Sequence, residues 1–189
     1  EFYQVLRQPD GSSLIVVGDV SGKGLKAAMT GALAIGSLRT LAEEMVSPAT
    51  LLTRLNQQIV ATQQGGFITC LCASVAADGR VALANAGHLP PYRNGEEMEL
   101  EGSLPLGIRE GEQYEQSTLE MEAGDRITLL TDGVVEAQSA SDELFGFERT
   151  RGLSRESAGS IAAAAQQFGQ RDDITVLTLT FVPVAELQV

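Results

Sequence analysis

The sequence predicts an α+β protein in which antiparallel sheets carry helices on their outer faces. Apolar runs rich in β-branched residues, typical of strands, recur at 14–19, 67–75 and 126–131. Asp-Gly and Asn-Gly pairs, which favour tight hairpins, stand at 10–11, 78–79 and 94–95. Apolar residues at helical spacing are concentrated in two regions, 25–64 and 144–168. Because hairpins join strands that run in opposite directions, antiparallel sheets with helices packed against them are expected.

The first third of the chain is expected to form two strands followed by two helices. Glu1–Arg7 is predicted to be a strand, and the next strand ends at Gly18-Asp19. Apolar residues recur at helical spacing over Leu25–Glu44 and predict the first helix. Ser47-Pro48 supplies an N-cap and a first-turn proline, so a second helix is predicted from there to about Gly65-Gly66.

The rest of the chain is expected to hold hairpins, late helices and a last strand. Strands are predicted over Phe67–Val75, Arg80–Asn85, Gln113–Met121, Arg126–Thr131 and a buried run from Ile174 to Val182, with a short strand at Tyr92. Helices are predicted over Val134–Ala137 and within Leu144–Phe168. The acidic segment Glu96–Leu106 is predicted to be a loop.

Length and composition fit one globular domain. The 189 residues, 43% of them hydrophobic, are enough for one well-buried core. We expect residues 1–189 to be a single domain and the C-terminal part of a longer protein, because the chain opens inside a predicted strand. No apolar run approaches the roughly 18 residues that a membrane span needs. The first residues, EFYQVLRQ, lack the basic start and apolar core of a signal peptide.

Charge and cysteine content restrict the partners and the compartment. The net charge of −12 argues against nucleic acid and against an anionic membrane surface, because phosphate affinity comes from Lys and Arg. An acidic protein that works on phosphate needs a cation, so this charge favours a metal site. Cys70 and Cys72 stand two apart in a predicted strand and face the same side. Two buried, reduced thiols are expected, which indicates a reducing, cytoplasmic location.

Asp19 ends a stiff apolar strand and is followed by flexible backbone. A carboxylate held there suits a hard cation or an approaching phosphate, and a capping Asp in a strand–turn–helix corner is the other interpretation. A P-loop is excluded by spacing and because Lys23 is followed by Gly24 instead of Ser or Thr. The dinucleotide fingerprint G-x-G-x-x-G/A is matched by Gly22, Gly24 and Ala27, so a dinucleotide-binding domain is an alternative.

Three aspartates share this position at the ends of apolar strands: Asp19, Asp132 and Asp172. Buried acids need partners, and like charges at converging strand ends repel until cations neutralise them. Ligation by oxygen alone suits Mg²⁺ or Mn²⁺. Two such ions activate water and clamp both ends of an in-line phosphoryl displacement. The alternative interpretation is that each Asp makes a turn or caps a helix.

Four motifs, in this order, resemble the SpoIIE/RsbU branch of the metal-dependent PP2C-type (PPM) protein phosphatases: VVGDVSGKG, NAGHLPPY, LLTDGVVEA and RDDITVLTL. The resemblance implies a four-layer αββα sandwich and Mn²⁺- or Mg²⁺-dependent hydrolysis of phosphoserine or phosphothreonine on a protein. The substrate that it implies is a small STAS-domain antagonist of an anti-sigma factor in bacterial partner switching. An upstream sensor domain and a homodimer are compatible with it.

The resemblance also implies roles for individual residues. Asp19 bridges two metal ions, the carbonyl of Val20 helps to bind one of them, and Asp132 and Asp172 hold the other. These three aspartates are the expected catalytic set. Where the family has Gly-Gly-Asp, this chain has Glu1, so the second metal site depends on that side chain. A catalytically weak binding module of the same fold is therefore an alternative.

Three further features complete the expectations. His88, the one histidine, is expected to have a structural hydrogen-bonding role in the NAGH turn instead of acting as a general acid. Lys23 and Lys26 either assist an incoming phosphate or are ordinary solvated lysines. The helical pair Leu25–Glu44 and Pro48–Gln64 corresponds to the region that acts as a regulatory switch in this branch.

Overall fold

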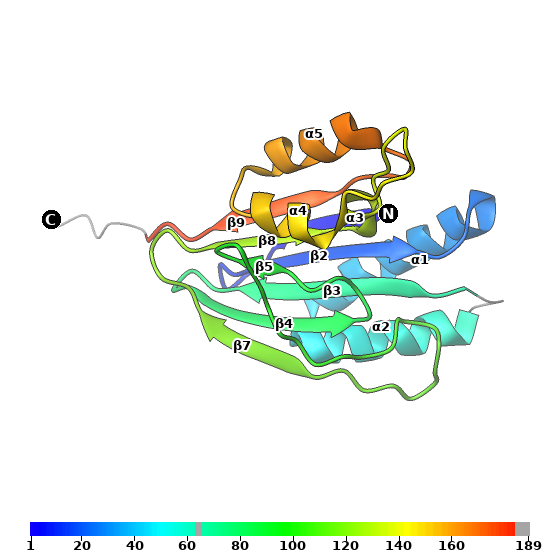
Figure 1. Ribbon diagram of the computed structural model, residues 1–189. Coiled ribbons are helices and arrows are strands. Elements are labelled where there is room, and N and C mark those ends of the chain that lie inside the picture. Colours follow the sequence, from blue (N-terminus) through cyan, green and yellow to red (C-terminus); the bar gives the residue numbers. More distant parts are fainter. Residues whose placement is uncertain (63–65, 184–189) are drawn as a thin grey trace, which may run out of the picture.

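Two antiparallel sheets, packed face to face, form the centre of the computed structural model, which describes residues 1–62 and 66–183 (Figure 1). The first sheet has the strand order β1-β2-β3-β4-β7. Its strands are β1 (Phe2–Arg7), β2 (Ser13–Val20), β3 (Ile68–Val75), β4 (Arg80–Ala86) and β7 (Gln116–Glu120). The second sheet has the order β6-β5-β8-β9. Its strands are β5 (Tyr92–Arg93), β6 (Glu96–Glu97), β8 (Arg126–Leu130) and β9 (Val176–Thr180).

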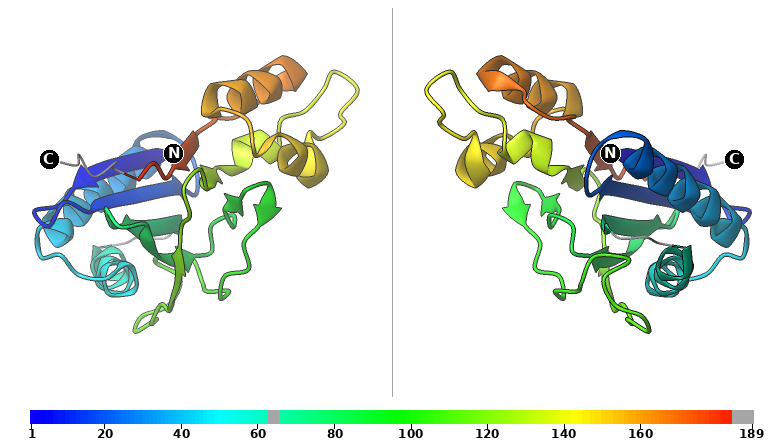
Figure 2. Two further views of the ribbon diagram at one scale, coloured as in Figure 1. Left: turned by 90° about the vertical axis from the view of Figure 1, so that its left-hand side faces the viewer. Right: turned by 90° about the vertical axis from the view of Figure 1, so that its right-hand side faces the viewer.

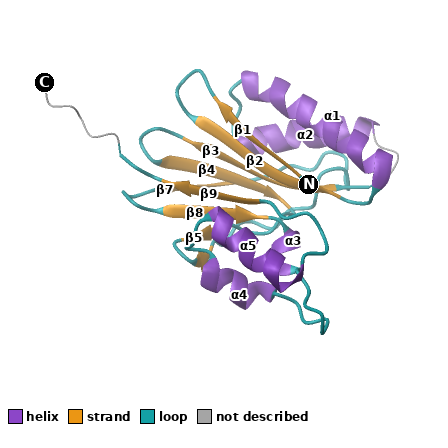
Figure 3. Cartoon of the chain, turned by 90° about the horizontal axis from the view of Figure 1, so that it is seen from above, coloured by secondary structure: helices purple, strands orange, loops and turns teal. Residues whose placement is uncertain are grey.

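Helices cover the outer face of each sheet (Figure 3). The first sheet is covered by α1 (Gly24–Glu43) and α2 (Pro48–Thr62), and the second by α3 (Asp132–Val135), α4 (Gly146–Leu153) and α5 (Ala158–Gly169). The layers therefore follow the order helix, sheet, sheet, helix. This arrangement confirms the α+β class and the four-layer sandwich.

Three apolar clusters hold the four layers together. One lies between the first sheet and α1 and α2, one between the two sheets, and one beneath α3, α4 and α5. Strand β3 shows how alternation divides the residues: Cys70 and Cys72 face the helices, whereas Leu71 and Ala73 face the second sheet. Both cysteines are buried and free, as the sequence predicts.

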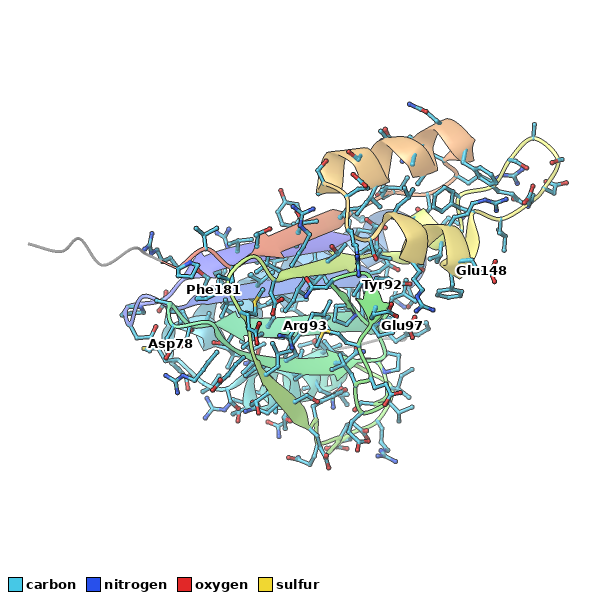
Figure 4. All side chains as sticks on the ribbon, turned by 60° about the vertical axis from the view of Figure 1, so that its left-hand side comes forward. Asp78, Tyr92, Arg93, Glu97, Glu148 and Phe181 are labelled. Carbon is cyan, nitrogen blue, oxygen red and sulfur yellow. The ribbon has the colours of Figure 1, made fainter. Side chains whose placement is uncertain are left out.

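One end of the sandwich is closed by apolar packing. Phe181 and Asp78 lie together at this end, while Tyr92 and Glu97 lie toward the other (Figure 4). A Cβ atom on Gly79 would be 3.0 Å from Cζ of Phe181, so the β3–β4 hairpin and the segment after β9 are in close contact here. Strands β2 and β8 both end at the opposite edge, where the N-terminus also lies (Figure 1).

The predicted strands and short helix differ from the structure most clearly in β9, β6 and α3, and β7 also begins three residues after the predicted Gln113. The last strand was expected to be buried, but β9 is half-buried because it is the edge strand of its sheet. Strand β6 lies inside the predicted loop Glu96–Leu106, and its two exposed glutamates carry no apolar pattern. Helix α3 begins at Asp132, two residues before the predicted Val134, because that aspartate occupies its first turn.

Helix α1 agrees with prediction in extent to within one residue at each end, and of its apolar residues at helical spacing it buries Leu38 and Leu41 but not Leu25, Met29 or Leu33. Its exposed side chains include Leu25 (77%), Met29 (64%) and Leu33 (40%). The residues that α1 buries are Gly31, Ala34, Leu38, Leu41 and Ala42.

Helix α2 has the predicted start. The Ser47 hydroxyl accepts a hydrogen bond of 3.3 Å from the backbone N–H of Thr50, which confirms the N-cap. The helix is described to Thr62, and of its predicted end at Gly65-Gly66, Gly65 lies outside the described residues. In the part of the chain that the structure covers, no helix is both long and apolar enough to cross a membrane.

Candidate functional site

The three predicted aspartates lie at the edge of the sandwich where β2 and β8 end. Asp19 is the penultimate residue of β2, and Asp132 opens α3 one residue after β8 ends. Asp172 lies in the turn before β9, which pairs with β8 through Leu130 and Val176. The two central strands of the site thus come from different sheets, and the sheet packing brings their ends together.

The electrostatics of Asp132 show that the acids lie near one another. Burial raises the pKa of its carboxyl group, and the negative charges of Asp19 and Asp172 raise that pKa further. Repulsion of this kind favours either a proton or a cation at the site. Three acids that are far apart in the sequence therefore act on one another across a short distance in the fold.

Asp19 is positioned by the pairing of β1 with β2. Phe2 is in register with Gly18, which brings Glu1 beside Asp19. The main-chain nitrogen of Glu1 lies 3.5 Å from Oδ1 of Asp19, whose side chain is 29% exposed. A Cβ atom at Gly18 would be 2.6 Å from Cζ of Phe2, so glycine is required for the aromatic ring to lie across β2. The packing of Phe2 on Gly18 therefore fixes Glu1 of the β1 segment next to Asp19.

Glu1 provides the observation that best fits a bound cation. Its side chain is only 7% exposed, and Oε2 accepts a hydrogen bond of 2.6 Å from the hydroxyl of Thr175. Its other oxygen, Oε1, is buried and has no hydrogen-bond partner. Burial raises the pKa of this carboxyl group. A buried carboxylate oxygen without a partner carries a free-energy cost that a divalent ion removes.

Close backbone contact joins the turn after β8 to the turn before β9. A Cβ atom at Gly133 would lie 1.8 Å from the carbonyl oxygen of Asp173 and 3.4 Å from Oε1 of Glu1. The backbone N–H of Asp173 donates a 2.8 Å hydrogen bond to Oδ1 of Asp172. Only glycine at position 133 allows Asp132, Asp172 and Glu1 to occupy the same edge.

Glu136 belongs to this acidic cluster, although it was not among the predicted site residues. Burial raises the pKa of its carboxyl group, followed by repulsion from Asp132, Asp172 and Asp19. Its backbone N–H donates to the carbonyl of Asp132 at 2.8 Å. The signal was present in LLTDGVVEA: residues four apart on a helical turn are neighbours, so an acid at 136 lies next to one at 132.

His88 is held in the NAGH turn by several hydrogen bonds. Its Nδ1 lies 2.9 Å from the hydroxyl of Thr69, and its backbone N–H donates to Oδ1 of Asn85 at 2.8 Å. The Asn85 amide donates back to the His88 carbonyl at 2.9 Å. Burial lowers the pKa of His88 to about 4, so the ring is neutral at pH 7. These contacts agree with the structural role expected for this histidine.

The donor set fits a hard divalent cation. Carboxylate oxygens from both sheets meet at one edge, and one of them is buried without a partner. Over residues 1–62 and 66–183, no three His, Cys, Asp or Glu side chains lie close enough together to hold a metal ion, so the acids form an open cluster that is suited to a cation only in its donor type.

Hollows border this cluster on several sides. One, of about 60 Å³, lies beyond Val20 and is lined partly by Lys23 and Lys26. Another, of about 260 Å³, is lined partly by Glu136 and Asp172, and one of about 450 Å³ is lined partly by Glu1. A larger hollow of about 880 Å³ has a different lining that contains none of the clustered acids.

The dinucleotide-binding alternative is wrong on topology. That fingerprint works at the turn of a parallel βαβ unit. Strand β2, which precedes Gly22 and Gly24, pairs antiparallel with both β1 and β3. The glycines therefore serve the turn between β2 and α1.

Comparison with known proteins identifies the family. The family described as Stage II sporulation protein E (SpoIIE) matches residues 9–182. The chain belongs to the SpoIIE family. One curated relative, the phosphoserine phosphatase RsbU of Bacillus subtilis (strain 168), is 29% identical over 147 residues, which cover 74% of this chain and 43% of RsbU. The chain thus spans less than half the length of that relative, and the family resemblance seen in the motifs is confirmed.

Solved structures of other proteins share the fold. The SiaA-PP2C domain of Pseudomonas aeruginosa matches with a TM-score of 0.80 at 26% identity, covering 95% of this chain and 80% of that chain. The RsbU and RsbW domains of Rv1364c from Mycobacterium tuberculosis match with a TM-score of 0.81 at 21% identity, covering 96% of this chain and 55% of that chain. The SpoIIE-family sandwich described above is therefore a PP2C-like fold.

Proposed function

We propose that this domain is a metal-dependent protein phosphatase that hydrolyses phosphoserine or phosphothreonine on a protein. The observation that carries the proposal is that Asp19, Asp132 and Asp172, from separate parts of the chain, lie at the one edge of the sandwich where β2 and β8 end and where the chain enters β9. Membership of the SpoIIE family and the similarity to RsbU, a phosphoserine phosphatase, support the same activity.

Asp19, Asp132 and Asp172 would hold Mn²⁺ or Mg²⁺, with help from the Val20 carbonyl, and Glu1 would complete a second ion site. When bound, such ions acidify water to give a nucleophile and neutralise charge on the phosphoryl oxygens. Glu1 suits this role because its Oε1 is buried and unpartnered while Thr175 fixes its other oxygen. The required preorganisation comes from the protein, through strand ends and close turns that leave the carboxylates little freedom.

The remaining residues of the site orient the acids. Gly133 lets the turn after β8 contact the Asp173 carbonyl, which keeps Asp132 and Asp172 on adjacent turns. Neutral His88, bonded to Thr69, fixes the strand that is in register with Asp19. No group of the protein needs to form a covalent phosphoenzyme, because the nucleophile is water.

We propose a phosphorylated STAS-domain antagonist of an anti-sigma factor as the substrate, in cytoplasmic partner switching. RsbU is a relative of this chain, and Rv1364c carries an RsbU domain together with an RsbW domain. Two buried free cysteines are compatible with a reducing compartment.

A phosphatase assay on a phosphoserine protein, with Mn²⁺ and then with excess EDTA, tests the proposal. Release of phosphate is expected with Mn²⁺ and is expected to stop with EDTA. Calorimetric titration with Mn²⁺ separates the alternative of a binding module. Binding of metal without turnover of any phosphoprotein, or a folded protein that binds no Mn²⁺ at millimolar concentration, would contradict the proposed activity.

A further inference from the structure

A hollow of about 260 Å³ opens on the Asp172 side of the acidic cluster and contains one cationic side chain. Its lining residues are Gly133, Glu136, Gln138, Leu144, Arg171 and Asp172. The loop that joins α3 to α4 forms one wall and stands away from both sheets (Figure 2, yellow). Arg171 directly precedes Asp172, so a cation and a predicted metal ligand enter the same hollow from one turn.

The guanidinium of Arg171 is not tied to the cluster acids. Its ion pair is with Oδ1 of Asp142 at 3.1 Å, and the two side chains are 61% and 76% exposed. An ion pair this exposed stabilises little, because both groups remain hydrated when they separate. Arg171 is therefore able to exchange Asp142 for another oxyanion without a large loss of free energy.

The loop beside Arg171 has its own supports. The backbone N–H of Ser139 donates to the Glu143 carbonyl at 2.9 Å, and that of Asp142 donates to the Ser139 carbonyl at 3.0 Å. Gln138 bridges to Leu144, and its side-chain amide donates to the Asp142 carbonyl at 3.1 Å. These contacts close the loop without Arg171. The loop therefore does not need the guanidinium to keep its shape.

The negative charge of the hollow explains why a cationic side chain is useful there. Glu136 and Asp172 are both exposed, and their negative charges repel an anionic substrate that approaches along this wall, although solvent and salt screen part of that repulsion. Arginine presents a planar fork of N–H donors that matches the geometry of phosphate and carboxylate oxygens. Leu144, 52% exposed at the same hollow, adds an apolar surface for a neighbouring side chain of a protein substrate.

We infer that Arg171 is a substrate-binding residue that leaves Asp142 to bind an oxyanion of the phosphoprotein. This inference rests on the proposed phosphatase function and adds to it a determinant of substrate affinity. The oxyanion is either the phosphoryl group itself or a carboxylate that flanks the phosphorylated residue. Asp142 is the resting partner of the guanidinium and competes with the substrate for it.

Three variants of the chain test the inference: Arg171→Ala, Arg171→Lys and the matched control Asp142→Asn. Asp142 has a φ of 63°, a left-handed conformation that Asn adopts with little strain, so the control removes the charge and keeps the loop. Thermal melting verifies that each variant is folded. KM and kcat are measured with Mn²⁺ on a phosphoserine peptide with acidic flanks, on its neutral-flank version and on para-nitrophenyl phosphate. Fluorescence anisotropy measures the Kd of a non-hydrolysable phosphonate version of the acidic-flank peptide.

Loss of a charge-assisted contact made equally in the ground and transition states raises KM and leaves kcat unchanged, so Arg171→Ala is expected to raise KM about tenfold. The KM of Arg171→Lys is expected to lie between those of the wild type and Arg171→Ala. Asp142→Asn is expected to leave KM unchanged or to lower it. A rise with para-nitrophenyl phosphate identifies the phosphoryl group as the ligand of Arg171. A rise confined to the acidic-flank peptide identifies a flanking carboxylate.

Two results would overturn the inference. Equal increases in KM for Arg171→Ala and Asp142→Asn would show that the ion pair only supports the loop. Unchanged KM and unchanged phosphonate affinity in Arg171→Ala would show that the guanidinium does not bind substrate. A wild-type chain that hydrolyses nothing, but loses phosphonate affinity in Arg171→Ala, would contradict the phosphatase proposal and leave the binding role of Arg171 standing.

Discussion

Two aspartates flank strand β8, and their surroundings are opposite. Asp125, just before the strand, accepts hydrogen bonds from the Arg93 guanidinium at 2.5 Å, from the Asn94 amide at 2.6 Å and from the Glu122 backbone at 2.9 Å. These donors lower the pKa of Asp125 to about 2. Asp132, just after the strand, has burial and two like charges around it, and its pKa is raised.

This contrast separates a structural carboxylate from one that needs a partner from outside the protein. Asp125 has its donors in the fold and ties the β5–β6 hairpin to the start of β8. Asp132 stands among Asp19, Asp172 and Glu136, all acceptors. A charge that the fold itself leaves unneutralised is typical of functional sites, because selection for stability alone removes such repulsion.

The largest expected difference between the two positions is in catalysis. Asp132→Asn and Asp19→Asn are each expected to lower Mn²⁺-dependent kcat/KM by more than about a hundredfold, because metal-ion charge stabilisation is worth several kcal/mol. Asp125→Asn is expected to retain activity while it is folded. Phosphate release from a phosphoserine peptide measures both. Comparable losses at 125 and 132 would remove the distinction between the two ends of β8.

A second prediction concerns the contact that holds Asp132 in place. Gly133→Ala is expected to destabilise the protein by about 1–3 kcal/mol, because its Cβ would overlap the Asp173 carbonyl. Gly36→Ala, in the exposed part of α1 with no atom within 4 Å, is the matched control and is expected to gain up to about 1 kcal/mol. Urea unfolding measures both variants. An unchanged free energy of unfolding in Gly133→Ala would show that the turns after β8 and before β9 separate readily.

The stability of the metal-free protein sharpens the comparison further. A carboxyl group whose pKa is raised in the fold stabilises the protein below its unfolded pKa, and that contribution is lost as pH rises through the folded pKa. Asp132→Asn is therefore expected to raise Tm at pH 7 in EDTA, by an amount that shrinks toward pH 4. Addition of Mn²⁺ is expected to stabilise the wild type more than the variant. A Tm that falls in the EDTA-treated variant would contradict the repulsion.

Asp125 has the opposite pH dependence and the smallest expected effect. Because its folded pKa of about 2 lies below the unfolded value, its contribution is present above about pH 4 and is lost as pH falls through 2. Asp125→Asn is expected to be less stable than wild type at pH 7, with the difference disappearing toward pH 2. Thermal melts across this range in EDTA measure it. A constant difference at all pH values would assign the effect to packing instead of charge.

Much of the fold was accessible from the sequence because local patterns and the fold agree. The apolar run before Asp19 and the alternation around Cys70 each predict a strand that the structure contains. Ser47 predicts the start of α2 through a single side chain. The pattern failed at β6, whose exposed glutamates carry no apolar signal, although the Asn94-Gly95 turn sets them opposite Tyr92 and Arg93.

The sequence predicted which residue types form the candidate site, but not the contacts between them. Asp-Gly after an apolar strand marks a carboxylate at a strand end, yet the close approach of Gly133 to Asp173 involves residues 40 positions apart and leaves no local signal. Leu25, Met29 and Leu33 of α1 match a helical stripe but are exposed, because a periodic pattern does not state how far a helix extends over its sheet. Whether the three aspartates bind metal remains a prediction.

The two cysteines can report on whether α1 and α2 detach from the first sheet. Burial raises the pKa of Cys70 to about 12 and that of Cys72 above its usual range, so neither thiol reacts at neutral pH while α1 and α2 cover the first sheet. Alkylation of these thiols therefore requires that helical layer to detach. The rate of labelling by an alkylating agent would measure how often the layer detaches, without any engineered probe.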